Sequence, residues 1–186
     1  MSFYKHHRQR RFYKRMAMKI KTAIITLSDT RRLPSQDESG VVMRQYLEAA
    51  GYEVVSYDLI RDEYDDIVRV LTQRCDEDVD LLLTTGGTGV SLRDQTPEAT
   101  QVVIEKEVPG ISEALRAYSL TLTPHAMFSR AVAGIRGKTL LINLPGSKKA
   151  VEQSLTFLLP HLPHAVAVLQ GQVNQCASTE DSHRQI

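Results

Sequence analysis

The sequence predicts an α/β fold built on a largely parallel β-sheet. Short apolar segments alternate with segments in which apolar residues recur at helical spacing, and polar or glycine-rich turns separate them. This alternation is typical of βαβ units, which are joined by right-handed crossovers. With 186 residues, of which 42% are hydrophobic, the chain has the size and composition of one domain with a single core.

The first half of the chain is predicted to contain three strands, at residues 22–27, 53–60 and 79–85. A polar loop at 31–40 follows the first strand, and the helix after it ends at Gly51 because glycine commonly terminates helices. Asp62 and Glu63 open a second helix before the third strand. Strand and helix therefore alternate through this half.

The second half continues the alternation with fewer strands. We expect helices at 96–106 and 111–120, a fourth strand at 138–144, a helix through 151–158 and a last helix after Pro160. Val108-Pro109-Gly110 separates the first two of these helices, since proline and glycine interrupt regular structure.

A glycine-rich loop directly after the third strand is the most informative feature of the chain. It contains Thr85, Gly86, Gly87, Thr88 and Gly89. Glycines leave the backbone N–H groups free to approach a phosphate, and the Thr88 hydroxyl adds a donor. In open α/β sheets, ligands bind at such strand ends. The alternative is a tight turn that needs three glycines.

The segment after this loop predicts a helix start and a carboxylate. Thr96 is a candidate N-cap, and Pro97 suits the first helical turn. Asp94, just before it, offers a carboxylate to a metal ion or to a transferring group.

The fourth strand ends in a second turn of small residues. Pro145, Gly146 and Ser147 follow it and precede a helix. A helix N-terminus favours anions, so two such sites at the same edge of one sheet could hold two phosphorylated groups together.

Two long motifs resemble those of the molybdopterin adenylyltransferase family of the MogA/MoaB type. The first is TTGGTG at 84–89 with RD at 93–94 and TPEA at 96–99, and the second runs from Ser129-Arg130 through INLPGSKK at 142–149. The second motif is most similar to the G domain of gephyrin and its relatives. The resemblance covers about residues 20–170.

The resemblance implies a three-layer α/β/α sandwich with a mostly parallel sheet, usually trimeric. It also implies a reaction: AMP from ATP is joined to the terminal phosphate of molybdopterin, pyrophosphate leaves and Mg²⁺ is required. The product would pass to an enzyme that inserts molybdate. The alternative is a non-catalytic protein that binds molybdopterin or docks to other proteins of the pathway.

The resemblance assigns catalysis and Mg²⁺ binding to Asp62 and Asp94. Relatives often have proline before the first aspartate, where this chain has Arg61. Asp62 could instead cap the second helix. The expected substrate- and nucleotide-binding residues are Ser28, Asp29, Asp37, Ser39, Gly40, Thr85, Gly86, Gly87, Thr88, Gly89, Arg93, Ser129, Pro145, Gly146 and Ser147.

Two arginines and three histidines have open roles. Arg130 and Arg136 could bind phosphate or lie on the surface. His161 and His164 have i, i+3 spacing without a third ligand nearby in sequence, so we expect surface or packing positions, and we expect His125 in a loop.

Charge is unevenly distributed along the chain. The first 15 residues carry six Lys or Arg and no acid, which leaves 17 Lys or Arg against 22 Asp or Glu in the remainder. We expect a basic, disordered extension at 1–18, a domain at 19–171 and a polar tail at 172–186. The acidic remainder and the lack of an aromatic platform argue against nucleic-acid binding.

Membrane insertion is not expected, because no apolar run approaches the roughly 18 residues that a membrane span requires. The only cysteines, Cys75 and Cys176, form no disulfide or metal framework. This cysteine content suggests a reducing compartment and a cytoplasmic location.

Overall fold

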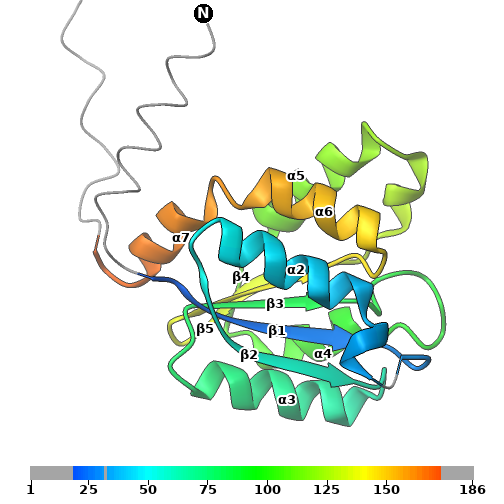
Figure 1. Cartoon of the computed structure of the whole chain (residues 1–186), viewed down its shortest axis with the longest axis horizontal. Helices are drawn as coiled ribbons and strands as arrows, with labels where there is room; N and C mark the ends of the chain where they lie inside the picture. Colours follow the sequence, from blue (N-terminus) through cyan, green and yellow to red (C-terminus); the bar gives the residue numbers. More distant parts are fainter. Residues whose placement is uncertain (1–18, 32, 173–186) are drawn as a thin grey trace, which may run out of the picture.

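The structure is a computed structural model that describes residues 19–31 and 33–172 (Figure 1). The expected extension at 1–18 and all but the first residue of the expected tail lie outside the described residues. The central element is a six-stranded sheet of order β2-β1-β3-β6-β5-β4. Its strands are β1 (Lys21–Leu27), β2 (Glu53–Ile60), β3 (Leu81–Thr85), β4 (Lys106–Glu107), β5 (Ala133–Arg136) and β6 (Thr139–Leu144).

The sheet is mostly parallel. Strands β2, β1, β3 and β6 run in the same direction, whereas β5 is antiparallel to β6 and β4 is antiparallel to β5. Leu27 of β1 pairs with Ile60 of β2, and Thr85 of β3 pairs with Leu144 of β6. The carboxyl ends of the four parallel strands therefore meet at one edge.

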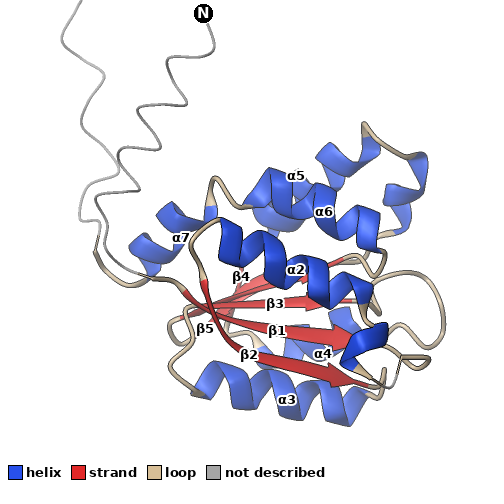
Figure 2. Cartoon of the chain, viewed as in Figure 1, coloured by secondary structure: helices blue, strands red, loops and turns tan. Residues whose placement is uncertain are grey.

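Helices cover both faces of the sheet and form the outer two layers (Figure 2). One face is covered by α2 (Glu38–Ala49), α5 (Pro109–Leu120), α6 (Lys148–Leu158) and α7 (Leu162–Leu169). The other face is covered by α3 (Tyr64–Asp76) and α4 (Thr96–Val103). Two 3₁₀ helices, η1 (Pro34–Gln36) and η2 (Pro124–Phe128), complete the described elements. The three-layer α/β/α sandwich with a mostly parallel sheet is confirmed.

Alternate side chains of the buried strands supply two hydrophobic cores, one on each face of the sheet, so the expectation of a single core is wrong. Ile24 of β1 and Ile142 of β6 contact the layer that contains α2 and α6, whereas Ile25 and Leu141, one position away, contact α3 and α4. This two-sided burial explains why the central strands read as continuous apolar runs rather than as an alternation of apolar and polar residues.

Several element boundaries differ from those that the sequence predicted. The predicted helix at 96–106 ends at Val103, because Ile104 is extended and the Glu105 N–H donates to the Ile135 carbonyl at 2.8 Å. The chain then forms β4, which pairs with β5. Neither of these short strands was predicted. Helix α2 begins at Glu38, inside the segment that was expected to be loop.

A crevice forms at the carboxyl edge of the sheet because the helices after two neighbouring strands pack on opposite faces. Strands β3 and β6 are adjacent, but α4 follows β3 on one face and α6 follows β6 on the other. Helices that leave neighbouring strands toward opposite faces open a crevice between the loops, where α/β proteins bind ligands. Among the described residues, no helix combines the length and apolar character that crossing a bilayer requires.

Candidate functional site

The glycine-rich loop after β3 depends on two glycines with left-handed backbone conformations. Gly86 has φ 105° and Gly87 has φ 63°. A Cβ at Gly86 would lie 2.3 Å from the Leu27 carbonyl oxygen, and one at Gly87 would lie 2.4 Å from Asp62 Oδ1. Only glycine fits both the conformation and the space at these two positions.

Thr96 stabilises this loop in a way that differs from the N-cap role expected for it. Helix α4 begins at Thr96 and its N-cap is Gln95, which makes no side-chain cap hydrogen bond. The Thr96 hydroxyl donates to the Gly86 carbonyl at 2.9 Å, and its N–H donates to the Gly87 carbonyl at 3.2 Å. The prediction of Thr96 as the cap is wrong; its side chain fastens the glycine loop to the first turn of α4.

The second loop, residues 145–147, lies against the glycine-rich loop that follows β3. A Cβ on Gly146 would be 3.2 Å from the Gly86 Cα. The Thr85 hydroxyl donates to the Pro145 carbonyl at 2.7 Å, and the Ser39 hydroxyl donates to the Gly146 carbonyl at 2.9 Å. Thr85 and Ser39 are thus turned toward the loop backbone and hold it in place.

Ser147 caps the helix that follows this loop. Its Oγ accepts a hydrogen bond from the Ala150 N–H at 3.3 Å at the start of α6. The prediction of a strand, a small-residue turn and a helix N-terminus is confirmed here. The N-terminal end of α6 lines the same cavity as the glycine loop, through Ser147 and Ala150.

Asp62 lies under the glycine loop and does not cap a helix. Helix α3 begins at Tyr64, and its N-cap is Glu63. Asp62 is only 8% exposed, and its Oδ1 is buried without a hydrogen-bond partner. Burial, together with the nearby carboxylates of Asp29 and Asp94, raises the pKa of Asp62 to about 6. A buried carboxylate oxygen without a donor needs a proton or a cation.

Asp94 lies on the other side of the same loop. A Cβ at Gly89 would be 2.8 Å from Asp94 Oδ2, so the carboxylate rests directly on the Gly89 backbone. The Ser91 N–H donates to the same oxygen at 3.1 Å. Asp94 also lines the cavity described below. The two predicted catalytic carboxylates therefore flank one glycine loop.

Arg93 joins the ends of the first two strands to this loop. Its guanidinium donates to both carboxylate oxygens of Asp29, at 3.0 and 3.1 Å, and to Glu63 at 2.8 Å. These hydrogen bonds hold the pKa of Asp29 below its ordinary value. Asp29 therefore stays charged and contributes to the raised pKa of Asp62.

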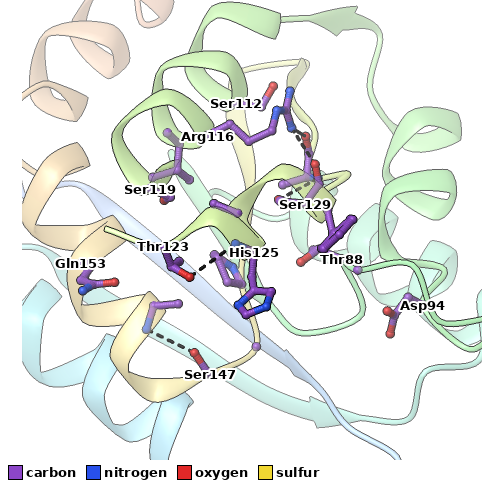
Figure 3. A pocket seen from close by; sticks show the side chains of 18 of the residues that line it. Thr88, Asp94, Ser112, Arg116, Ser119, Thr123, His125, Ser129, Ser147 and Gln153 are labelled. Atoms are coloured by element: carbon purple, nitrogen blue, oxygen red, sulfur yellow. Dashed lines mark hydrogen bonds between the residues drawn. The ribbon is translucent and has the colours of Figure 1, made fainter. Parts of the chain in front are cut away.

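A cavity of about 440 Å³ opens beside both loops (Figure 3). Eight predicted site residues line it: Gly87, Thr88, Gly89, Asp94, Ser129, Pro145, Gly146 and Ser147. The remaining predicted residues Ser28, Asp29, Asp37, Ser39, Gly40, Asp62, Thr85, Gly86 and Arg93 lie outside its lining. Most of these residues form hydrogen bonds with the backbone of the two loops or with one another.

One wall of the cavity, formed by α5 and η2, contains no residue that the sequence predicted for the site. Figure 3 shows side chains from this region around the same cavity as Ser147, the N-cap residue of α6. They include Ser112, Arg116, Ser119, Thr123, His125 and Phe128. His125 had been expected only as a loop residue. A usable signal was present, because Ser112, Arg116 and Ser119 follow i, i+4, i+7 spacing and form one polar stripe on a helix.

Asp37 and Gly40 have structural roles at the start of α2. Asp37 is fully buried and accepts hydrogen bonds from the Gly40 N–H at 3.0 Å, from Arg31 at 3.1 Å and from the Tyr57 hydroxyl. A Cβ at Gly40 would lie 2.3 Å from an Asp37 oxygen. Ser28 similarly accepts from the Arg31 N–H at 3.1 Å within its own turn. These side chains already have protein partners.

No group of three or more His, Cys, Asp or Glu side chains in the described residues is arranged to hold a metal ion. The Asp62 and Asp94 carboxylates, which lie against the glycine loop, could supply part of a coordination shell for a hard cation. Mg²⁺ commonly takes one or two carboxylates and completes its shell with water and substrate phosphates.

The chain is similar to proteins of molybdenum cofactor biosynthesis. The profile of a domain family described as "Probable molybdopterin binding domain" matches residues 23–164. A molybdopterin adenylyltransferase of Helicobacter pylori is 46% identical over 123 residues, which cover 64% of this chain and 70% of that protein. Gephyrin of Dictyostelium discoideum is 42% identical over 131 residues, which cover 70% of this chain and 18% of that protein.

A solved structure supports the same relationship. The crystal structure of the molybdopterin biosynthesis enzyme MoaB from Thermus thermophilus matches with a TM-score of 0.75 at 43% sequence identity. The match covers 82% of this chain and 97% of that one. Residues 23–164, which the family profile matches, include both loops and both carboxylates described above.

Proposed function

The chain belongs to the MogA/MoaB-type family of molybdopterin-binding domains, and from this premise we propose that it transfers AMP from ATP to the terminal phosphate of molybdopterin. Pyrophosphate is released, and adenylyl-molybdopterin is the product. The observation that carries the proposal is the placement of Asp62 and Asp94 against one glycine loop, which lines a cavity of about 440 Å³.

The reaction requires two anions to be brought together. An oxygen of the molybdopterin phosphate forms a bond to the α-phosphorus of ATP, and the bond from that phosphorus to pyrophosphate breaks. Phosphoryl-type transfers depend mainly on positioning and on stabilisation of developing charge. The protein therefore needs hydrogen-bond donors that hold the phosphate oxygens and carboxylates that hold a cation.

The glycine loop and α6 supply such donors. The Gly87 and Gly89 backbones reach the cavity without side chains, and Thr88 adds a hydroxyl. The N-terminus of α6, beginning after Ser147, favours a second anionic group. Two phosphorylated substrates would thus meet between the two loops, and the α5 and η2 side chains provide hydroxyl, imidazole and aromatic contacts for the pterin.

The carboxylates fit a Mg²⁺ ion. The Asp62 Oδ1 atom is buried without a donor, and the neighbouring Asp29 and Asp94 carboxylates raise the cost of its charge. Asp62 and Asp94 would hold the ion, which when bound would neutralise phosphate charge on the substrates. Arg93 keeps Asp29 charged and oriented beside them.

The test is to incubate the purified protein with molybdopterin, ATP and Mg²⁺ and to separate the products by chromatography with mass detection. We expect adenylylated pterin and pyrophosphate in equal amounts. Asp94→Asn serves as the control that retains the shape of the loop. Stoichiometric binding of molybdopterin without adenylylated product would instead favour the alternative, a binding or docking protein.

We further propose that the chain forms a homotrimer and passes its product to an enzyme that inserts molybdate. Both proposals come from the family resemblance. A cytoplasmic location likewise remains a prediction from the cysteine content.

A further inference from the structure

Arg130 makes an unusual set of contacts with the loop that carries Asp94. Its Nε donates to the Gly89 carbonyl at 2.6 Å, and its Nη2 donates to the Asp94 carbonyl at 2.6 Å. Its Nη1 pairs with Glu98 in the first turn of α4. In addition, the Arg130 N–H donates to the Thr88 carbonyl at 2.9 Å. One residue therefore binds the backbone on both sides of residues 90–93.

Packing contributes little to the position of these four residues. Val90 is 69% exposed and Leu92 is 97% exposed, so neither side chain anchors the segment in the core. The hydrogen bonds between Ser91 and Asp94 stay within the turn. Arg93 ties this segment to Asp29 and Glu63, which follow the first two strands. Arg130, which precedes β5, joins the two ends of the turn, Gly89 and Asp94.

All three guanidinium nitrogens already have protein partners. Nε and Nη2 each donate to a loop carbonyl, and Nη1 faces the Glu98 carboxylate. This arrangement disfavours a role in which Arg130 binds a substrate phosphate. The rigid, planar fork of arginine fits two carbonyls and a carboxylate at fixed angles, which a lysine ammonium on a flexible stem cannot reproduce.

We infer that Arg130 is a positioning residue: it fixes the Asp94 carboxylate over the glycine loop without itself contacting either substrate. The inference rests on the proposed AMP transfer. Reacting groups must be held to within a fraction of an ångström, and a displacement of about 1 Å can cost about a hundredfold in rate. Loss of the Arg130 fork should therefore lower turnover more than substrate binding.

The test compares Arg130→Lys and Arg130→Ala with a matched control, Arg136→Lys. Arg136 also donates to a backbone carbonyl, that of Val103, and to a carboxylate, that of Asp76, but it lies away from the loop. The values of kcat and of KM for ATP are measured below the melting temperature of every variant. Hydrogen exchange of the amides at 90–94 is measured on the same proteins.

We expect Arg130→Lys to lower kcat by about 30- to 100-fold with KM for ATP within about threefold of wild type. The amides at 90–94 should exchange faster, and added guanidinium ion should partly restore kcat in Arg130→Ala. Arg136→Lys should match wild type in all three measurements. Because Arg130→Lys keeps the positive charge and most of the aliphatic stem of the side chain, it tests the inference even if the alanine variant folds poorly.

Three outcomes would overturn the inference: unchanged kcat in Arg130→Lys, raised KM with normal kcat, or unchanged amide exchange at 90–94. Raised KM would identify Arg130 as a phosphate-binding residue instead. Absence of adenylylated product with the wild-type protein would refute the proposed function, and the positioning role for AMP transfer with it, whatever the variants do. Activity in wild type with normal kcat in Arg130→Lys refutes the positioning role alone.

Discussion

Replacing Asp62 with asparagine should stabilise the protein while it abolishes AMP transfer. The Asp62 Oδ1 atom is buried without a partner, and burial raises the pKa of this carboxyl from an ordinary 3.8 to about 6. At about 1.36 kcal/mol per pKa unit, that shift corresponds to about 3 kcal/mol of unfavourable charge at Asp62 at neutral pH, which comes from burial and from the nearby Asp29 and Asp94 carboxylates. Water at the mouth of the crevice reduces this figure, so we expect Asp62→Asn to increase the free energy of unfolding by about 1 to 3 kcal/mol.

The effect should depend on pH in one direction. The folded protein binds the Asp62 proton more tightly than the unfolded chain does, so the wild type loses stability relative to the variant as pH rises from about 4 to above 6. The two proteins should therefore have similar stability at pH 4, where the carboxyl is protonated. The difference should reach its full size by about pH 7.5.

Urea denaturation of both proteins at several pH values, without Mg²⁺, measures this difference. Asp58→Asn is a suitable control on β2, the strand that precedes Asp62, because Asp58 forms an ion pair with Arg74 at 2.7 Å. Its replacement should lower stability by up to about 1 kcal/mol. The reasoning is refuted if Asp62→Asn is less stable than wild type at pH 7.5, or if its advantage does not change with pH.

Three further predictions concern the loop and the assembly. Asp94→Asn should bind molybdopterin almost normally but lose about 3 kcal/mol of transition-state stabilisation, roughly a hundredfold in kcat; near-normal turnover would show that Asp94 is only a loop residue. Gly87→Ala should lower the free energy of unfolding, measured by urea denaturation, by about 1 to 3 kcal/mol, because Gly87 has φ 63° and a Cβ would lie 2.3 Å from Thr96 Oγ1. Unchanged stability would contradict the conclusion that only glycine fits at this position. Sedimentation velocity at micromolar concentration should give a trimer, and a monomer alone would contradict that proposal.

The sequence predicted those parts of the fold that depend on local pattern. The strand at 53–60 matches β2 in both bounds, because its apolar residues and flanking turns are unambiguous. Strands β4 and β5 were missed for a physical reason. Lys106 and Glu107 are exposed and carry no periodicity, and their extended form depends on pairing with Gly134 and Ile135 far along the chain. Nonlocal pairing of this kind leaves no local signal.

The candidate site was predictable to a similar extent. The two loops could be located because glycine, proline and helix-capping residues have strong local meaning, as at Gly86 and Ser147. The cavity wall was not located, because a polar stripe such as Ser112, Arg116 and Ser119 on α5 does not by itself distinguish the wall of a cavity from a solvent-exposed helix face. The role of Arg130 was also open, since its three partners lie 32 to 41 residues away in sequence.

The most direct test of the proposed reaction follows the phosphorus atoms of ATP. The protein is incubated with molybdopterin, Mg²⁺ and ATP that is radiolabelled at either the α- or the γ-phosphorus. Transfer of AMP predicts that the α-label appears on the pterin product and that the γ-label is released in pyrophosphate. Appearance of the γ-label on the pterin, or of no label at all, would contradict the proposal that the two loops and their carboxylates catalyse AMP transfer.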